Sequence, residues 1–225
     1  MVRSSRSKAV VLLSGGLDST TTLYYALDKG YACQVLIFDY GQRHKKELRS
    51  AVAVAKLAKV PYQILKIKLP WKGSSLLDKK MPIPKSRIPV SPFTSASNIP
   101  STYVPARNTI FLSFALSLAE AIGAKAIFIG ANALDYSGYP DCRPEYYQAF
   151  QKVIEKGIKA SRIKIVTPLI DLTKAEIIKL GRKLGAPLEM TWSCYQGGKE
   201  PCGVCDSCRL RDKGFAHFSS ELTMI

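Results

Sequence analysis

The segment Ser-Gly-Gly-Leu-Asp-Ser at residues 14–19 has the composition of an anion-binding loop. It follows an apolar run at 8–13 and overlaps the start of a helical pattern at 18–29. Glycines allow several backbone N–H groups to face one ligand, and the N-terminus of the following helix adds partial positive charge. Neighbouring hydroxyl groups add donors, and the carboxylate of Asp18 can cap the helix or help to hold a magnesium ion. We therefore predict a phosphate-binding loop at 14–19.

This loop differs from two common phosphate-binding motifs. It is not followed by Gly-Lys-Ser/Thr, as in a Walker loop, and its glycine spacing is not that of the dinucleotide fingerprint. The loop resembles instead the SGGxDS motif of the PP-loop ATP pyrophosphatases. That resemblance implies that ATP binds here with magnesium and is cleaved between its α and β phosphates. It also implies an α/β fold with a doubly wound, five-stranded parallel sheet, of the Rossmann-like adenine nucleotide alpha-hydrolase type.

The resemblance to the PP-loop superfamily extends beyond the loop. A second superfamily motif is similar to residues 167–176, and its lysine, Lys174 here, approaches the ATP phosphates. The alternative is an ordinary solvated lysine on a helix. Backbone groups near Phe38, at the end of the second predicted strand, are placed to bind adenine. The predicted ATP-binding residues are Leu13, Ser14, Gly15, Gly16, Leu17, Asp18, Ser19, Thr20, Phe38 and Asp39.

Four cysteines near the end of the sequence, Cys194, Cys202, Cys205 and Cys208, have the spacing of a metal site. Four thiolates complete a tetrahedral shell around zinc and leave no open position, so we predict one structural zinc ion. The C-x2-C-x2-C part also begins a ferredoxin-type iron–sulfur run. That run requires a fourth cysteine at position 212, which is Asp. Zinc is therefore the favoured metal.

The elements that must position these residues alternate between strand and helix patterns. Such alternation is typical of βαβ units with right-handed crossovers, and it predicts a parallel sheet covered by helices on both faces. Ligands of such sheets bind at the carboxyl ends of the strands. The expected strands are 8–13, 32–38, 62–67, 126–129 and 163–166, and the expected helices are 18–29, 42–59, 108–121, 145–156 and 173–184.

We predict two structural units in the chain. Residues 1–186 form the ATP-binding α/β domain, and residues 187–225 form a small zinc-binding C-terminal segment. Within the first unit, residues 69–105 are rich in proline and serine and show little periodicity. A loop of that length inside a compact domain is usually functional. We interpret 69–105 as a substrate-covering lid or insertion loop, with a passive excursion as the alternative.

Composition restricts the class of protein. The 225 residues suffice for one core, and the apolar runs are shorter than the roughly 18 residues of a membrane span. The basic N-terminal octet lacks a signal-peptide pattern, so a cytoplasmic protein is expected. The 33 Lys and Arg against 17 Asp and Glu leave a net charge of +16. This charge favours anionic partners such as nucleotides or nucleic acid, although a solvated charged surface explains it equally well.

Several longer segments are more specific. They are SGGLDS at 14–19, FDYGQRH at 38–44, YVPARN at 103–108, GANALDYSGYPDCR at 130–143, and TWSC at 191–194 with the three later cysteines. Read in this order, they resemble the QueC family of 7-cyano-7-deazaguanine synthases across nearly the whole chain. The DYSGYPDCR part is highly specific to that family. The basic 79–87 segment and the N-terminal octet are the least familiar parts, and neither touches a motif.

The QueC resemblance implies a particular reaction. ATP activates the carboxylate of 7-carboxy-7-deazaguanine, ammonia attacks to form an amide, and a second activation dehydrates the amide to a nitrile. The product enters the biosynthesis of queuosine or archaeosine, two modified tRNA bases. The resemblance further implies a homodimer that uses small-molecule substrates, and no direct binding of nucleic acid is expected. Because the sequence contains no ammonia-producing domain, free ammonium or another partner must supply the nitrogen.

The same resemblance places a substrate pocket around 130–143. Carboxylates of Asp135 or Asp141 suit the guanidine-like N–H groups of the base, and the rings of Tyr136 or Tyr139 suit its face. Arg143 or Arg107 suits a carboxylate or phosphate, and ordinary loop capping is the alternative for each. Cys142 is interpreted as a pocket thiol. The predicted catalytic residues are Asp18, Ser19, Lys174 and Arg107, and the predicted substrate-binding residues are Tyr40, Gln42, Arg43, His44, Asn108, Asn132, Asp135, Tyr136, Tyr139, Asp141 and Arg143.

Two other functions compete with this interpretation. The first is a different PP-loop enzyme that modifies tRNA, such as a thiolase, and the positive charge suits it. The second is a zinc-bearing regulatory or nucleic-acid-binding protein that retains an inactive ATP fold. An intact phosphate loop and intact pocket residues argue against the second alternative.

Overall fold

A computed structural model of the chain describes residues 6–85, 99–132, 139–159 and 162–222. Its centre is a five-stranded sheet in the order β3-β2-β1-β4-β5, and every neighbouring pair is parallel. The predicted fold class is therefore confirmed. The strands are β1 (Lys8–Leu12), β2 (Ala32–Asp39), β3 (Tyr62–Lys66), β4 (Ala126–Phe128) and β5 (Lys164–Val166).

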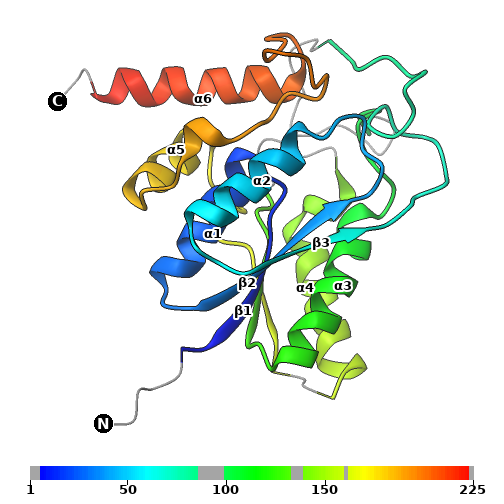
Figure 1. The fold of residues 1–225 in the computed structure, drawn as a ribbon, viewed down its shortest axis with the longest axis vertical. Helices are drawn as coiled ribbons and strands as arrows, with labels where there is room; N and C mark the ends of the chain where they lie inside the picture. The colour runs from blue at the N-terminus through cyan, green and yellow to red at the C-terminus, as the bar shows by residue number, and fades with distance from the viewer. Residues whose placement is uncertain (1–5, 86–98, 133–138, 160–161, 223–225) are drawn as a thin grey trace.

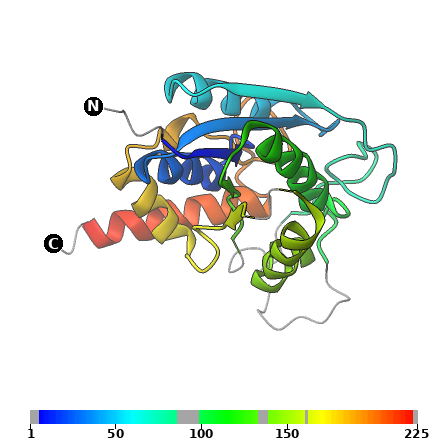
Figure 2. The same ribbon diagram turned by 90° about the horizontal axis from the view of Figure 1, so that it is seen from below.

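Helices cover both faces of this sheet. In Figures 1 and 2, α1 and α2 lie on one side and α3 and α4 on the other, as right-handed connections between parallel strands require. No helix in the described part of the chain combines the length and the apolar character needed to cross a membrane. The helices are α1 (Leu17–Asp28), α2 (Lys46–Leu57), α3 (Arg107–Ile122), α4 (Pro144–Gly157), α5 (Lys174–Lys183) and α6 (Asp206–Leu222), with short 3-10 helices at Pro140–Cys142 and Leu188–Met190.

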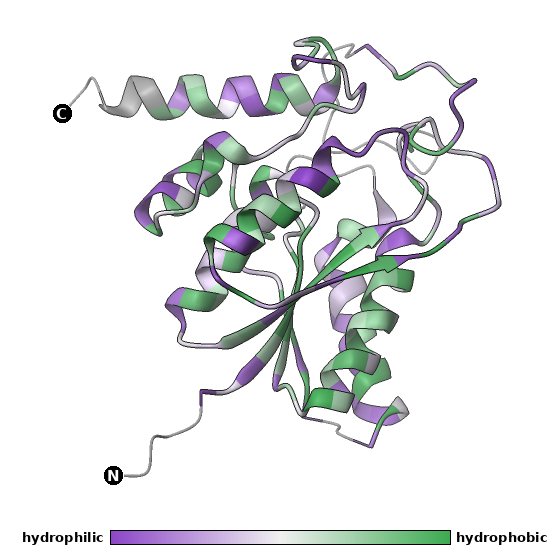
Figure 3. Cartoon of the chain, in the orientation of Figure 1, coloured by the Kyte–Doolittle hydropathy of each residue, from purple (hydrophilic) through white to green (hydrophobic). Residues whose placement is uncertain are grey.

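Side chains of β1 alternate between two apolar cores. Val10 and Leu12 join the core beneath α3 and α4, whereas Val11 joins Leu23 of α1 and Val54 of α2 on the opposite face. The four side chains of Ala9–Leu12 are buried, which explains why this part of the strand is a continuous apolar run rather than an alternating one. Figure 3 shows the apolar sheet at the centre and the polar residues on the outer faces of the helices.

The order of the strands determines where a ligand can bind. The chain moves from β1 outward to β2 and β3, and then returns to the other side of β1 to form β4 and β5. The connections from β1 and β4 therefore leave the sheet toward opposite faces and open a crevice at the carboxyl ends of these two strands. The 14–19 loop follows β1 directly, so the fold places this loop at that crevice.

Helices α5 and α6 form an additional layer beyond α1. Leu17, Ile177 and Leu188 are buried together, and Phe215 and Phe218 of α6 pack against this cluster. A capping box starts α5: Thr173 accepts the backbone N–H of Glu176, and the Glu176 carboxylate accepts the backbone N–H of Thr173. The sequence interpretation contained α5 but no helix at 206–222.

The predicted helix over 42–59 begins only at Lys46. The residues before it form a turn that the side chain of Gln42 closes. Its amide oxygen accepts the backbone N–H of Tyr40 at 2.9 Å, and its amide nitrogen donates to the Phe38 carbonyl at 3.2 Å. These bonds keep the end of β2 extended toward the crevice and delay the first turn of α2.

Candidate active site

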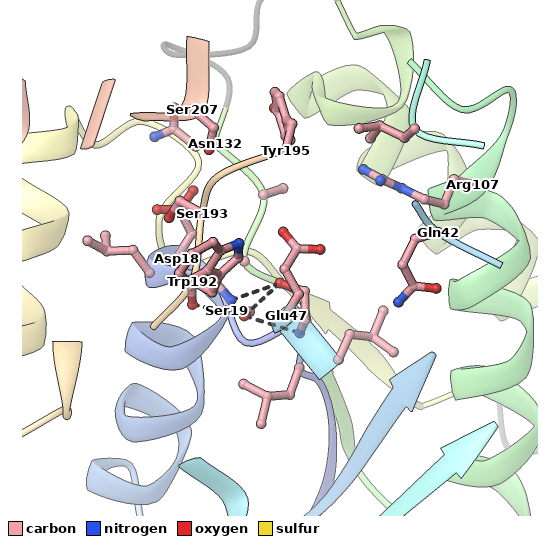
Figure 4. Close-up of a pocket in the computed structure, with 18 of the residues that line it drawn as sticks. Asp18, Ser19, Gln42, Glu47, Arg107, Asn132, Trp192, Ser193, Tyr195 and Ser207 are labelled. Carbon is pink, nitrogen blue, oxygen red and sulfur yellow. Dashed lines mark hydrogen bonds between the residues drawn. The ribbon is translucent and has the colours of Figure 1, made fainter. Parts of the chain in front are cut away.

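The 14–19 loop joins the end of β1 to the first turn of α1. The Ser19 hydroxyl lies at its centre, where it accepts the backbone N–H of Ser14 at 3.2 Å and donates to the Gly16 carbonyl at 3.2 Å. The two serine hydroxyls lie 3.0 Å apart. These bonds, drawn in Figure 4, hold the loop while the first turn of α1 presents its N–H groups to a pocket that Gly16, Leu17 and Asp18 also line.

Helix α2 supports the phosphate loop from behind. Gly15 has φ +88°, and a Cβ atom there would lie 2.3 Å from the Glu47 carbonyl oxygen and 2.5 Å from the Ala51 nitrogen. The Gly15 carbonyl accepts the Ser50 hydroxyl at 2.8 Å and the backbone N–H of Trp192 at 3.0 Å. Glycine is required at this position because of both its φ angle and the space available.

A salt bridge joins the loop to α5. The Nζ of Lys174 donates to the two carboxylate oxygens of Asp18 at 2.7 and 2.9 Å. The side chains are only 10% and 20% exposed, respectively, so solvent screens the pair weakly. Helix α6 presses on the lysine, because a Cβ on Gly214 would lie 2.6 Å from Lys174 Cγ.

The opposite wall of the pocket contains a half-buried arginine. Arg107, the first residue of α3, donates to the Tyr40 hydroxyl at 3.2 Å. Glu47 lines the same pocket from α2. Burial raises the pKa of Glu47 to about 7, and the charge of Arg107 opposes part of that shift. This wall therefore combines a fixed cation with a carboxyl group that changes charge near neutral pH.

Asp141 and Cys142 lie between α3 and α4. The Asp141 carboxylate accepts the backbone N–H of Asn108 at 3.1 Å, and the Asp141 carbonyl accepts the side-chain amide of Asn108 and the Tyr147 hydroxyl, each at 2.9 Å. Asp141 thus anchors the start of α3. Burial raises the pKa of Cys142 to about 12, so its thiol remains protonated at neutral pH.

The four predicted zinc ligands come together in the structure. The Sγ atoms of Cys194, Cys202, Cys205 and Cys208 all lie within 4.8 Å of one another. Four sulfurs on a tetrahedral zinc ion are about 3.8 Å apart for a Zn–S bond of about 2.3 Å, so a small contraction completes the shell. The arrangement fits a zinc site. The cysteine side chains also pack against Trp192 and other apolar side chains.

The model of the family described as "Queuosine biosynthesis protein QueC" matches residues 8–219.

This chain belongs to the QueC family.

Curated relatives agree with that assignment. A protein of Nostoc punctiforme named 7-cyano-7-deazaguanine synthase is 57% identical over 93% of this chain and 95% of its own length. A protein of Thermoplasma volcanium with the same name is 53% identical over 92% of this chain and 86% of its own length. Among solved structures, NMN synthetase from Francisella tularensis aligns with a TM-score of 0.51 at 14% identity, covering 95% of this chain and 85% of the other. That last likeness concerns the fold alone.

Most residues predicted for the site of this QueC protein line one pocket. Gln42 lines the pocket, and its side-chain amide also holds the turn after β2. Asn132 lines the pocket as well, and its side-chain amide donates to the carbonyls of Leu169 and Leu172. The predicted residues that line the pocket are Leu13, Ser14, Gly16, Leu17, Asp18, Ser19, Phe38, Tyr40, Gln42, Arg43, His44, Arg107, Asn108, Asn132, Tyr139 and Lys174, together with the pocket thiol Cys142.

Other predicted residues lie elsewhere. Gly15 and Thr20 support the loop from behind, and Asp39 pairs with Lys45 at the end of β2. Asp141 and Arg143 are not among the residues that line the pocket in the described structure, because the Asp141 side chain is bonded to α3. Asp135 and Tyr136 fall outside the described residues. Their predicted roles remain predictions.

Sequence reasoning missed several lining residues. Trp192, Ser193 and Tyr195 flank the first cysteine, and this proximity was the signal that they shared its loop. Arg211 of α6 had no such signal. Its guanidinium donates to the Thr191 hydroxyl at 2.6 Å and the Leu188 carbonyl at 2.9 Å, which holds the Trp192 loop over the pocket. The other lining residues that were missed are Leu12, Glu47, Leu76, Phe111, Ile129, Gly130, Ala131, Ser207 and Leu210.

The described parts of the predicted 69–105 loop contact this pocket. Leu76 lines it, and the Leu76 carbonyl accepts the backbone N–H of Arg43 at 2.9 Å. The Arg43 guanidinium donates to the carbonyls of Lys79 and Met81 at 2.7 and 3.1 Å. These bonds attach the first half of the loop to the end of β2. Its role as a lid remains a prediction.

Proposed function

We propose that this chain is a 7-cyano-7-deazaguanine synthase, an ATP-dependent carbon–nitrogen ligase. It converts 7-carboxy-7-deazaguanine and ammonia to 7-cyano-7-deazaguanine for the synthesis of queuosine or archaeosine. The observation that carries the proposal is one pocket that joins the phosphate loop to the Tyr40–Arg107 wall, in a chain 57% identical to a protein of that name.

Each turnover requires two activations. A carboxylate oxygen of the substrate first attacks the α phosphorus of ATP, and pyrophosphate leaves. The ammonia lone pair then forms a C–N bond, AMP leaves with the electrons of the C–O bond, and the nitrogen loses a proton to give the amide. The amide oxygen attacks a second ATP in the same way. Loss of both remaining N–H protons and of AMP leaves the nitrile.

ATP lies with its phosphates on the 14–19 loop and its adenine toward the Phe38 backbone. The loop N–H groups and the N-terminus of α1 bind the pyrophosphate. The rings of Phe38 and Phe111 are stacked with their centroids 4.0 Å apart, and they form a flat apolar surface at that end of the pocket. Magnesium bound with ATP neutralises phosphate oxygens, and Asp18 is its proposed protein ligand. Lys174 already holds this carboxylate near the phosphate site.

The substrate lies between the phosphate loop and α3. Arg107 presents a forked donor that suits its carboxylate, and bonding to Tyr40 restricts the arginine to one orientation. The Tyr139 hydroxyl, 2.5 Å from the Thr102 hydroxyl, forms a polar edge of the same pocket. Asn108 and Cys142 complete the wall behind it.

Zinc is proposed to act by shaping the pocket. One ion held by the four cysteines closes the loop from which Trp192 and Tyr195 line the site. The backbone N–H of Trp192 donates to Gly15, so the zinc loop is bonded directly to the phosphate loop. Because four thiolates fill the tetrahedral shell, the ion has no position left for substrate.

Other parts of the proposal go beyond the geometry of the pocket. The division into units 1–186 and 187–225 and a cytoplasmic location rest on the sequence pattern, a homodimer rests on the family resemblance, and direct nucleic-acid binding is not expected. Light scattering of the purified protein tests the dimer, and salt-dependent binding to tRNA tests the last point.

The decisive experiment supplies the purified enzyme with ATP, magnesium, ammonium and 7-carboxy-7-deazaguanine. Mass spectrometry should detect the nitrile, with release of AMP and pyrophosphate. A reaction that consumes ATP only with tRNA and a sulfur donor would instead indicate a thiolase. No nitrile under any of these conditions rejects the proposed function.

A further inference from the structure

Glu47 faces the active-site pocket from α2. It belongs to the first turn of α2 and lines the pocket between the phosphate loop and the Arg107 wall. In Figure 4 its side chain extends from beside Ser19 into the space bordered by Tyr195 and Arg107. This is the region between the proposed phosphate and substrate positions, where the acyl adenylate must form.

The backbone fixes Glu47 relative to the phosphate loop. Its carbonyl oxygen would lie only 2.3 Å from a Cβ on Gly15, so α2 and the loop touch without a side chain between them. The Ser50 hydroxyl, one turn further along α2, donates to the Gly15 carbonyl at 2.8 Å. The backbone of Glu47 is therefore held beside the phosphate loop by direct packing and a hydrogen bond between α2 and Gly15.

Glu47 is also chemically different from the other carboxylates nearby. Asp18 is engaged by Lys174, and Asp141 is engaged by the backbone of Asn108. Among the described residues, none donates a hydrogen bond to the Glu47 carboxylate or pairs with it in a salt bridge. The pKa raised to about 7 by burial places its proton exchange near neutral pH, where a general base works best.

We propose that Glu47 is the proton acceptor for the attacking nitrogen. The proposal rests on the proposed synthase function. When ammonia forms its C–N bond and AMP departs with the C–O electron pair, the positively charged nitrogen transfers one proton to the Glu47 carboxylate. Glu47 then releases this proton to solvent through the open pocket.

The same group serves the second half of the reaction. After the amide oxygen is adenylated, the nitrogen still carries two protons, and both must leave as the C≡N bond forms and AMP departs. The carboxylate accepts them one at a time and returns each to solvent between steps. One base therefore suffices for both halves, because the amide nitrogen is the atom that ammonia supplied.

The first adenylation provides a clean separation of roles. The substrate is already a carboxylate when it attacks the α phosphorus, so this step releases no proton from nitrogen. Replacement of the base should spare the acid-dependent exchange of labelled pyrophosphate into ATP and impair nitrile formation. A residue that binds the substrate would impair both.

The test compares Glu47→Gln with Glu145→Gln in the wild-type assay. Glu145 is an exposed glutamate in the first turn of α4 and does not line the pocket, so its replacement is a matched control. Glu47→Gln should retain pyrophosphate exchange within about threefold, with an unchanged KM for the acid, and lose about 10²- to 10⁴-fold in nitrile formation. Glu145→Gln should match the wild type in both assays.

The pH dependence of nitrile formation distinguishes a base from a residue with a purely structural role. The wild-type rate of nitrile formation should rise through about pH 7, and Glu47→Gln should lose this rise. Burial lowers the pKa of His44 and raises that of Cys142 to about 12, so neither produces a rise at that pH. The other charged or titratable groups that line the pocket are Asp18, Tyr40, Arg43, Arg107, Tyr139, Lys174, Tyr195 and Arg211.

Several results would overturn the inference. Parallel loss of exchange and nitrile formation, or a raised KM for the acid, would make Glu47 a substrate-binding residue. Full nitrile formation by a folded Glu47→Gln enzyme would exclude it as the base. If that variant does not fold, Glu47→Asp keeps a carboxylate about one methylene further back and should show partial nitrile formation with the pH rise retained; loss of that rise would reject the proposal. Failure of the synthase function itself is distinct, because the wild type would then make no nitrile.

Discussion

The Nζ of Lys174 lies 2.7 and 2.9 Å from the two carboxylate oxygens of Asp18, so that α5 and the phosphate loop are joined by one salt bridge. Both groups line the pocket where the pyrophosphate is proposed to bind. When ATP and magnesium bind, the phosphates offer negative charge to Lys174, and the magnesium ion offers positive charge to Asp18. The pair therefore keeps both groups in place before ATP arrives, and we expect ATP to redistribute their contacts.

Replacement of Asp18 tests this arrangement. Asp18→Ala should lower nitrile formation and pyrophosphate exchange together by about 10²-fold or more, because the carboxylate acts at the phosphates in every activation. The fold should survive, since the freed ammonium group of Lys174 can reach water in the pocket. Asp28→Ala, an exposed position at the end of the same helix, is the control and should be active. Circular dichroism together with both assays gives the answer.

Gly15 provides a test of the packing between the loop and α2. Gly15→Ala should destabilise the protein by about 3 kcal/mol or more, because the new methyl group meets the backbone at 2.3 Å and the φ angle of +88° is unfavourable. Gly30→Ala shares a positive φ of +77° but meets no atom within 4 Å, so it should cost about 1 kcal/mol. Equal losses in urea unfolding would show that the close approach is unimportant.

The zinc site predicts a different pattern of effects. Cys205→Ser should weaken zinc binding at least about 100-fold and lower the melting temperature, because a buried ligand is lost. Elemental analysis of the wild type should find one zinc per chain and no iron. If Cys205→Ser retained wild-type stability but abolished catalysis, the ion would have a catalytic rather than a structural role.

The pocket thiol is expected to be dispensable for chemistry. Burial raises the pKa of Cys142 to about 12, which leaves almost no thiolate at neutral pH. Cys142→Ser preserves an acceptor for the Asn108 amide, which lies 3.5 Å from the sulfur. Nitrile formation should therefore stay within about threefold of the wild type. A covalent adduct on Cys142 in the mass spectrum of the working enzyme would contradict this expectation.

The carboxyl group of Glu47 should also affect stability. Its pKa rises from an ordinary value of 4.5 to about 7 in the folded chain, so the folded state holds this proton more tightly than the unfolded state. The stability that the protonated carboxyl group contributes to the folded state is therefore lost as pH rises through this interval. Glu47→Gln should become more stable relative to the wild type over the same range. Thermal unfolding between pH 4 and 8 measures the difference in stability between Glu47→Gln and the wild type. If Glu47 had an ordinary pKa, this difference would not change between pH 4.5 and 7.

Local pattern was enough to find several parts of the site. The residues of the loop at 14–19, and likewise the four cysteines between 194 and 208, lie close together in the sequence, so their types and spacing were enough to predict both features. The alternation of strands and helices likewise predicted the parallel sheet. The boundary of α2 was less accessible, because the side-chain bonds of Gln42 delay the helix by a few residues.

Other features depend on contacts between distant segments. The sequence did not indicate that the Asp141 carboxylate bonds to the start of α3, 33 residues away in sequence, and its predicted role at the substrate stays a prediction. Helix α6 was absent from the sequence interpretation, although Phe215 and Phe218 pack it onto the rest of the protein. Such choices follow from which neighbour buries or satisfies a side chain, and neighbours far apart in sequence have no local signature.

The amino-acid sequence by itself therefore determined the α/β fold class and the family, and it predicted the phosphate loop at 14–19 and the four cysteines that come together in the structure. These features rest on interactions within a few residues or on the periodicity of burial. Only the tertiary structure decided that Asp18 meets Lys174, 156 residues away, and that Glu47 faces the pocket rather than solvent. The physical reason is that a side chain's partners, its solvation and its pKa are set by the elements that pack around it, and parallel crossovers bring those elements from distant parts of the chain.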